Sequence, residues 1–193
     1  YIYHNNTLVE EHIIGIPGDD FMERLERLHT GHNEVRLAKE FVKFNERCFV
    51  RLLGDMRAYN WVVVINQDFD QIQYRIRSID FDQQSYEGRH RIYLPQFYKE
   101  NLPYVQLTQR NMAIETAQQY VNEEQALLRK RYKLAEDQIT ELLTIMKQDR
   151  ISKPAHVKML GRELCKFHAD EEFLKLKSMG ALLERNIHVR LKF

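Results

Sequence analysis

Two periods of apolar residues along the chain predict where helices and strands lie. From Glu34 to Leu53 apolar side chains recur at intervals of three, four and seven residues, which indicates one buried stripe on a long helix. Gly54 is expected to end that helix. Trp61–Ile65 is then a mostly β-branched run, WVVVI, and Ile72–Ile79 alternates between apolar and polar residues. These two runs predict a hairpin that turns within Asn66–Gln71.

The flanking segments predict a short strand before this region and helices after it. Thr7–Phe21 begins as a β-type run and breaks at its glycines and proline, and Asp19 or Asp20 is expected to cap a helix that starts near Phe21. From about Thr108 the pattern is helical. Helices are expected over Ala113–Tyr132, over Ile139–Met146, from Ser152 and Pro154 to Phe167, and from a cap at Asp170 to Met179, where Gly180 interrupts the pattern.

Composition narrows the class of protein. With 193 residues, 44% apolar and 30% charged, the chain has the composition of a soluble globular protein. A net charge of +1 argues against binding nucleic acid through bulk electrostatics, and no apolar run approaches membrane-spanning length. We expect a cytoplasmic protein in which Cys48 and Cys165 are reduced thiols, although one disulfide between them stays open.

Candidate chemistry lies at the two ends of the predicted hairpin. Asp55 follows the long helix, Asn60 comes five residues later, and Asp80 stands directly after the second strand. Phosphoryl transfer needs such a set, because one carboxylate orients or deprotonates the acceptor hydroxyl while an amide oxygen and a second carboxylate hold Mg²⁺ against the phosphates. The hairpin allows Asn60 and Asp80 to converge although they are far apart in the sequence.

In this order and spacing the residues resemble the C-terminal lobe of the protein-kinase-like superfamily. There a catalytic Asp and a metal-binding Asn are separated by four residues, as Asp55 and Asn60 are. A second metal-binding Asp opens a short motif, and Ile79–Asp82, IDFD, is similar to its form in aminoglycoside and choline kinase relatives. The pattern DxxxYN followed by IDxxQ looks most like the RIO-type kinases. The resemblance implies that Asp55 is catalytic and that Asn60 and Asp80 bind the metal.

The resemblance also covers the segment before the long helix, so it extends over roughly residues 7–85. Leu8–Gly15, LVEEHIIG, is similar to the strand and hinge that join the two lobes, where backbone groups hold the adenine of ATP. It therefore implies nucleotide contacts at three neighbouring residues, Glu11, His12 and Ile13. The cofactors that it implies are ATP and Mg²⁺.

The fold that follows is α+β and mainly α. We expect residues 1–107 to form the hinge strand and the catalytic core of a kinase-like C-terminal lobe, with a catalytic-loop β-hairpin. Residues 108–193 would form the helical remainder of the lobe and an extension, and the N-terminal lobe is not in this chain. The expected function is an ATP/Mg-dependent phosphotransferase, whose partners are a nucleotide and a phosphate acceptor that is either a small molecule or a protein, with no membrane involved.

Two alternatives stay open. The family commonly has His just before the catalytic Asp, whereas Leu53 and Gly54 precede Asp55 here, and this difference motivates a non-catalytic pseudokinase that acts as a scaffold or regulatory module. The other alternative is an α-rich domain whose acidic loops carry no chemistry.

The letters DFDQ occur twice, at Asp68–Gln71 and at Asp80–Gln83, and we interpret the two copies differently. The first copy lies in the predicted hairpin loop, where Asp favours local side-chain hydrogen bonds. The second copy follows the returning strand. Within it, Asp82 is either a second metal ligand or a cap for the segment that follows, and we prefer the cap.

Overall fold

The computed structural model describes residues 2–3, 7–8, 12–28, 33–68 and 71–193. These residues form a mainly helical protein with two small antiparallel sheets, so the expected α+β class, mainly α, is confirmed at that level. The helices are α1 (Gly18–Leu28), α2 (Glu34–Val50), α3 (Leu102–Asn111), α4 (Ile114–Leu134), α5 (Glu136–Gln148), α6 (Pro154–His168) and α7 (Met179–Leu191). The short 3₁₀ helices are η1 (Ala58–Asn60), η2 (His90–Tyr93), η3 (Pro95–Phe97), η4 (Lys99–Asn101) and η5 (Glu171–Lys175).

The predicted hairpin is confirmed, and it forms two strands of a three-stranded sheet. Strand β4 (Trp61–Asp68) pairs with β5 (Gln71–Ser78), and the pairing runs from Trp61 opposite Ser78 to Asp68 opposite Gln71. Strand β4 is thus longer than expected, and the first DFDQ copy spans the hairpin turn, although residues 69–70 lie outside the described part. A short strand, β3 (Ile16–Pro17), joins the other edge of β4. Strands β1 (Ile2–Tyr3) and β2 (Thr7–Leu8) pair with each other.

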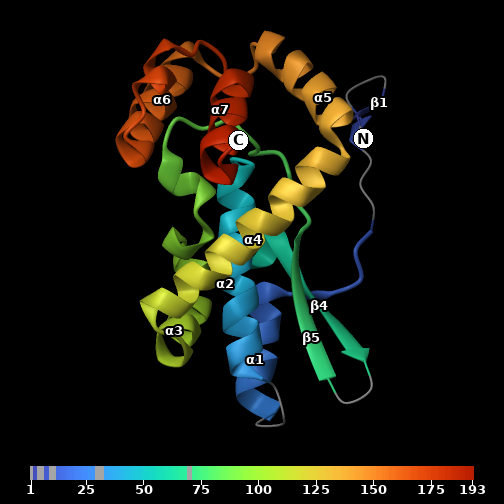
Figure 1. Ribbon diagram of the computed structural model, residues 1–193. Coiled ribbons are helices and arrows are strands. Elements are labelled where there is room, and N and C mark those ends of the chain that lie inside the picture. Colours follow the sequence, from blue (N-terminus) through green and yellow to red (C-terminus); the bar gives the residue numbers. More distant parts are fainter. Residues whose placement is uncertain (1, 4–6, 9–11, 29–32, 69–70) are drawn as a thin grey trace.

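Helix α2 joins the two halves of the protein. Figure 1 shows α4 crossing α2, with α1 and α3 toward one end of α2 and α5, α6 and α7 toward the other. Its Phe41 and Phe44 belong to an apolar cluster that includes Trp61 of β4, while Phe49 and Val50 belong to a second cluster with the C-terminal helices. The single buried stripe predicted for this helix therefore serves two cores in succession.

A buried charge network ties α2 to the hairpin and to α4. The Nη2 of Arg47 lies 2.5 Å from Oε1 of Glu40, which also accepts a hydrogen bond of 2.9 Å from the backbone N–H of Ile76 in β5. The Nη1 of Arg47 lies 3.3 Å from Glu124 of α4. Removing one member would leave a buried charge without its partner, which is costly. The network therefore fixes how the hairpin lies on α2.

The N-terminal half departs from the predicted helix ends. Helix α1 begins at Gly18, and Asp19 and Asp20 lie in its first turn. Their negative charges interact favourably with the helix dipole there, but neither residue is the expected cap. Helix α2 ends at Val50, before the glycine at position 54 that was expected to end it. The chain leaves the helix early because Leu52 adopts a positive φ of 47°.

The C-terminal half departs from the prediction in two places. The helix expected over Ala113–Tyr132 is confirmed as α4, but a separate α3 that was not predicted precedes it, and Met112 is extended between α3 and α4. Asp170 caps the short η5, and Ser178 caps α7, so Gly180 lies inside a helix and does not interrupt one. Pro154 does begin α6, as predicted.

The fully buried Asn101 holds the loop after α2 against η3 and η4. Its Nδ2 donates to the backbone carbonyls of Met56 and Pro95, each at 2.8 Å. Replacing Asn101 by Ala leaves both carbonyls without this donor in a dry environment. We expect Asn101→Ala to lower the free energy of unfolding by about 2 kcal/mol or more, measured by urea denaturation.

The matched control is Asn122→Ala on the exposed side of α4, which should change the free energy of unfolding by less than about 0.5 kcal/mol. Equal effects of the two substitutions would contradict the structural role assigned to Asn101.

Candidate functional site

The loop that follows α2 is paired with the segment that follows β5. Leu53 forms an isolated antiparallel bridge with Gln84, the backbone N–H of Gly54 donates to the carbonyl of Gln83 at 3.3 Å, and the N–H of Ser85 donates to the carbonyl of Leu52 at 2.8 Å. Leu52 and Leu53 are both buried but belong to different apolar clusters. This opposite anchoring accounts for the positive φ of Leu52.

Asp55 is held by contacts to both its backbone and its side chain. Its N–H donates to the hydroxyl of Tyr98 at 3.0 Å, and Oδ1 accepts from Nε of Arg57 at 2.7 Å. Its φ is +54°, a conformation that costs a non-glycine residue energy and that is often retained at functional positions. The Asp55 side chain stays 34% exposed, so a solvent-borne group can reach it.

Asn60 connects Asp55 to the end of the hairpin. Its Nδ2 donates to the backbone carbonyl of Asp55 at 2.8 Å and lies 3.4 Å from Oδ2 of the same residue. The backbone carbonyl of Asn60 accepts from the N–H of Ile79 at 3.1 Å, directly before Asp80. The structure therefore brings Asp55, Asn60 and the backbone leading into Asp80 into one region, as the sequence predicted.

Asp80 and Asp82 form a compact acidic turn. Oδ1 of Asp80 accepts from the N–H of Asp82 at 3.1 Å. The pKa of Asp82 is raised above its usual value by partial desolvation, then by hydrogen bonding and charge repulsion with Asp80, with a smaller contribution from the charge of Asp55. Asp82 is nevertheless exposed, so solvent moderates these effects. No helix begins at this turn, and the preferred interpretation of Asp82 as a cap is therefore wrong.

The donor set of this region suits a hard cation only in part. Within the described residues no group of three or more His, Cys, Asp or Glu side chains is arranged to hold a metal ion. Asn60 and Asp80 supply one amide and one carboxylate, the oxygen donors that Mg²⁺ accepts when water and phosphate complete its shell. The assignment of Asn60 and Asp80 as metal ligands therefore stays a prediction.

The expected nucleotide hinge is described only in part. Glu11 lies outside the described residues. His12 is exposed and Ile13 is half-buried, and both lie outside any helix or strand just before β3. Since β3 pairs with β4, this segment enters the same sheet whose last strand leads into Asp80. The nucleotide contacts of Glu11, His12 and Ile13 stay a prediction.

Sequence reasoning missed two residues that contact Asp55. Arg57 pairs with Asp55 and also places Nη1 3.1 Å from Glu100, and the hydrogen bond with Asp55 is the main cause that raises the pKa of Arg57. Tyr98 donates from its hydroxyl to the carbonyl of Ile92, and burial raises the pKa of Tyr98 to about 12, so it stays protonated. Arg57 could have been noticed as a cation two residues after Asp55, whereas nothing in the sequence marks Tyr98.

The two cysteines are not joined by a disulfide bond. Cys48 and Cys165 are free thiols, and burial raises the pKa of Cys48 to about 12, which keeps that thiol protonated and unreactive. Within the part of the chain that the structure describes, no helix has the length and apolar character needed to span a bilayer.

Comparisons with known proteins leave the family open. No protein-family model matches the chain, and searches of curated proteins and of solved structures likewise found no match. What this site does is therefore inferred from the positions of Asp55, Asn60 and Asp80 and from their contacts.

The positive φ of Asp55 leads to a test of backbone strain. Asp55→Gly and Asp55→Ala both remove the carboxylate, but only glycine adopts this conformation without steric cost. We expect Asp55→Gly to be more stable than Asp55→Ala by about 1 kcal/mol in urea denaturation. At Ala126, an exposed position inside α4, the order should reverse, with Ala126→Gly less stable than the parent by about 1 kcal/mol. Equal stability of the two Asp55 variants would show that the loop relaxes and stores no strain.

The raised pKa of Asp82 predicts a pH-dependent stability. A carboxyl with a raised pKa binds more protons in the folded state than in the unfolded one, so stability falls as pH rises from the ordinary Asp value toward the raised one. Asp82→Asn should therefore raise the melting temperature at about pH 7. The gain in the free energy of unfolding should stay below about 1 kcal/mol because Asp82 is exposed, and at about pH 3 the substitution should have no effect. Glu141→Gln, on the exposed side of α5, is the control. A gain that persists unchanged at low pH would contradict the repulsion between Asp80 and Asp82.

Proposed function

We propose that this chain is the C-terminal lobe of an ATP- and Mg²⁺-dependent phosphotransferase of the protein-kinase-like kind. One observation carries the proposal: the loop after α2 and the segment after β5 are paired backbone to backbone, which places Asp55 and Asn60 beside the entry to Asp80. Convergence of these residues is what the resemblance in their order and spacing requires.

Asp55 is suited to orient or deprotonate the hydroxyl of a phosphate acceptor. Its carboxylate is partly exposed, and its backbone is restrained by Tyr98 and Asn60, so the reactive oxygen atoms are held in a fixed position. Positioning of this kind supplies much of the catalytic effect in phosphoryl transfer.

Asn60 and Asp80 are suited to hold Mg²⁺ together with the nucleotide phosphates. The Asn60 amide nitrogen is committed to Asp55, and its amide oxygen accepts no hydrogen bond from the described residues, which leaves that oxygen available as a ligand. The repulsion between Asp80 and Asp82 is the kind of interaction that a bound cation relieves. Mg²⁺, when bound, would neutralise charge that develops on the transferring phosphate.

Arg57 lies where it could contact a phosphate group next to Asp55. Its side chain is 36% exposed and already pairs with a carboxylate, and a guanidinium binds phosphate through the same fork of donors. In the present arrangement, however, Arg57 occupies Oδ1 of Asp55. This ion pair favours the second candidate function, a non-catalytic module of the same kind that binds nucleotide or a protein partner without turnover.

The metal-site part of the proposal is tested by Mg²⁺-dependent ATP binding to the full-length protein, followed by isothermal titration calorimetry. We expect Asp80→Asn to weaken binding by about tenfold or more, because a direct ligand of the cation loses its charge. Asp68→Asn is the matched control, since Asp68 occupies the same place in the first DFDQ copy, where β4 ends, and should leave the affinity within about twofold of the parent. Absence of ATP binding, or equal effects of the two variants, would refute the metal site.

The catalytic part is tested separately with Asp55→Asn. This variant should retain Mg²⁺-dependent ATP binding while phosphate transfer or ATP hydrolysis falls by about 10²- to 10⁴-fold, as expected when a general base is removed. Radiolabelled phosphate release would measure this loss. If the parent protein binds ATP and Mg²⁺ but shows no turnover that depends on Asp55, the non-catalytic module is the correct function.

A further inference from the structure

A large cavity lies on the other side of the segment that carries Asp82. Its volume is about 1040 Å³, enough for a ligand of the size of a cofactor or metabolite. Its walls are the segment Phe81–Tyr86, the connection between α5 and α6, the first turns of α6, and the segment that leads from η5 into α7. Asp55, Asn60 and Asp80 are not among the residues that line it.

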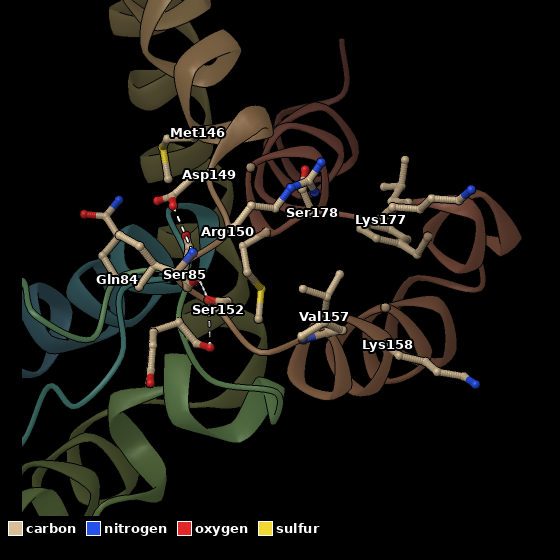
Figure 2. Close-up of a pocket in the computed structure, with 18 of the residues that line it drawn as sticks. Gln84, Ser85, Met146, Asp149, Arg150, Ser152, Val157, Lys158, Lys177 and Ser178 are labelled. Atoms are coloured by element: carbon tan, nitrogen blue, oxygen red, sulfur yellow. Dashed lines mark hydrogen bonds between the residues drawn. The ribbon is translucent and has the colours of Figure 1, made fainter.

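The walls of the cavity carry an excess of positive charge. Four cationic side chains line it, against two carboxylates at positions 82 and 149: Arg150, Lys158, Arg162 and Lys177. None of the four has an ion-pair partner within the described part of the chain. Figure 2 shows the Arg150 side chain reaching toward Ser178, while Lys158 and Lys177 extend outward at the far side of the cavity. A negatively charged ligand in the cavity would supply a partner for the Arg150 guanidinium.

The second independent feature is a polar group without a partner. Ser85 lines the cavity, is only 4% exposed, and its hydroxyl oxygen is buried with no hydrogen-bond partner among the described residues. A buried hydroxyl without a partner is unfavourable, and native proteins rarely leave one unless a ligand or water completes it. Ser85 also has a φ of +50° and is held in place by its N–H, which donates to Leu52.

Helix geometry adds to the positive potential. The N-terminal residues of α7, from Ser178 to Gly180, line the cavity, and the Ser178 hydroxyl already accepts from the N–H of Ala181 at 3.3 Å. The first residue of α6, Pro154, also lines the cavity. The positive ends of two helix dipoles thus face the same space.

The interior of the cavity is apolar. Val157, Phe173 and Met179 are all less than 9% exposed and line it, together with Gly161 and Gly180, where a side chain would collide with the backbone of Phe173 and Met146, respectively. Such a surface binds hydrocarbon, so a small inorganic ion would use only part of the site. A ligand that fits must carry both an apolar body and a negative charge.

We propose that this cavity binds a small organic anion, in which a phosphate or carboxylate group lies between Arg150 and the hydroxyl of Ser85 while an apolar body contacts Val157 and Met179. Because Asp82 lines the same cavity, the bound molecule would lie beside the acidic turn. Its use as the phosphate acceptor rests on the proposed function, whereas its binding does not.

The test uses phenyl phosphate as the probe, titrated into the full-length protein by calorimetry without nucleotide or Mg²⁺. We expect saturable binding that Arg150→Met weakens by about tenfold or more and Ser85→Ala by about threefold or more, because a charged and a neutral hydrogen bond are lost, respectively. The matched controls are Arg110→Met on the exposed side of α3 and Ser78→Ala, another buried serine whose hydroxyl lacks a partner among the described residues but which lies outside the cavity. Both controls should stay within about twofold of the parent.

Three further probes define the ligand class. Benzoate separates carboxylate from phosphate recognition, and phenol and benzylammonium should bind at least about tenfold more weakly than phenyl phosphate, because they lack the negative charge. Equal binding of the neutral or cationic probe, no saturable binding of either anion, or full binding in both Arg150→Met and Ser85→Ala would overturn the proposal. Thermal melting checks that Ser85→Ala is folded. Because Arg150 is exposed, Arg150→Met is expected to fold and tests the proposal even if Ser85→Ala does not fold. Failure here leaves ATP binding unaffected, so the two proposals fail independently.

Discussion

The short backbone pairing between Leu52–Gly54 and Gln83–Ser85 is the contact on which the candidate site depends. It holds two segments side by side although a 3₁₀ turn and a full hairpin separate them in the sequence. Leu52 and Leu53 anchor one segment in two different apolar clusters, so this segment cannot slide along the other without exposing a leucine. The pairing therefore restrains the relative positions of Asp55, Asn60 and the segment that carries Asp80.

The elements that position this pairing were largely predictable from the sequence. Helix α2 and the β4–β5 hairpin follow from clear periods, because most of their apolar residues face a single core or sheet. The convergence of Asp55, Asn60 and Asp80 was predictable for the same reason, since a hairpin returns the chain to its starting point.

Other features depend on contacts that leave no local pattern. The hydroxyl of Tyr98 reaches Asp55 from a distant irregular segment, and Asn101 joins Met56 to Pro95 in the same way. The break between α3 and α4 at Met112 and the true start of α7 at Ser178 are decided by tertiary packing, because residues such as Gly180 satisfy more than one local structure. The basic cavity is also invisible in the sequence, since its walls come from segments that are far apart along the chain.

The β4–β5 hairpin has a consequence for how the protein folds. A hairpin joins neighbouring residues and closes a short loop, so its entropic cost is small. Once it has formed, Leu53 and Gln84 are separated by a much shorter effective loop than the intervening chain would impose. We therefore expect hairpin formation to precede the pairing of these two segments, so that the acidic turn and the loop of Asp55 are assembled late and together, as one kinetic unit.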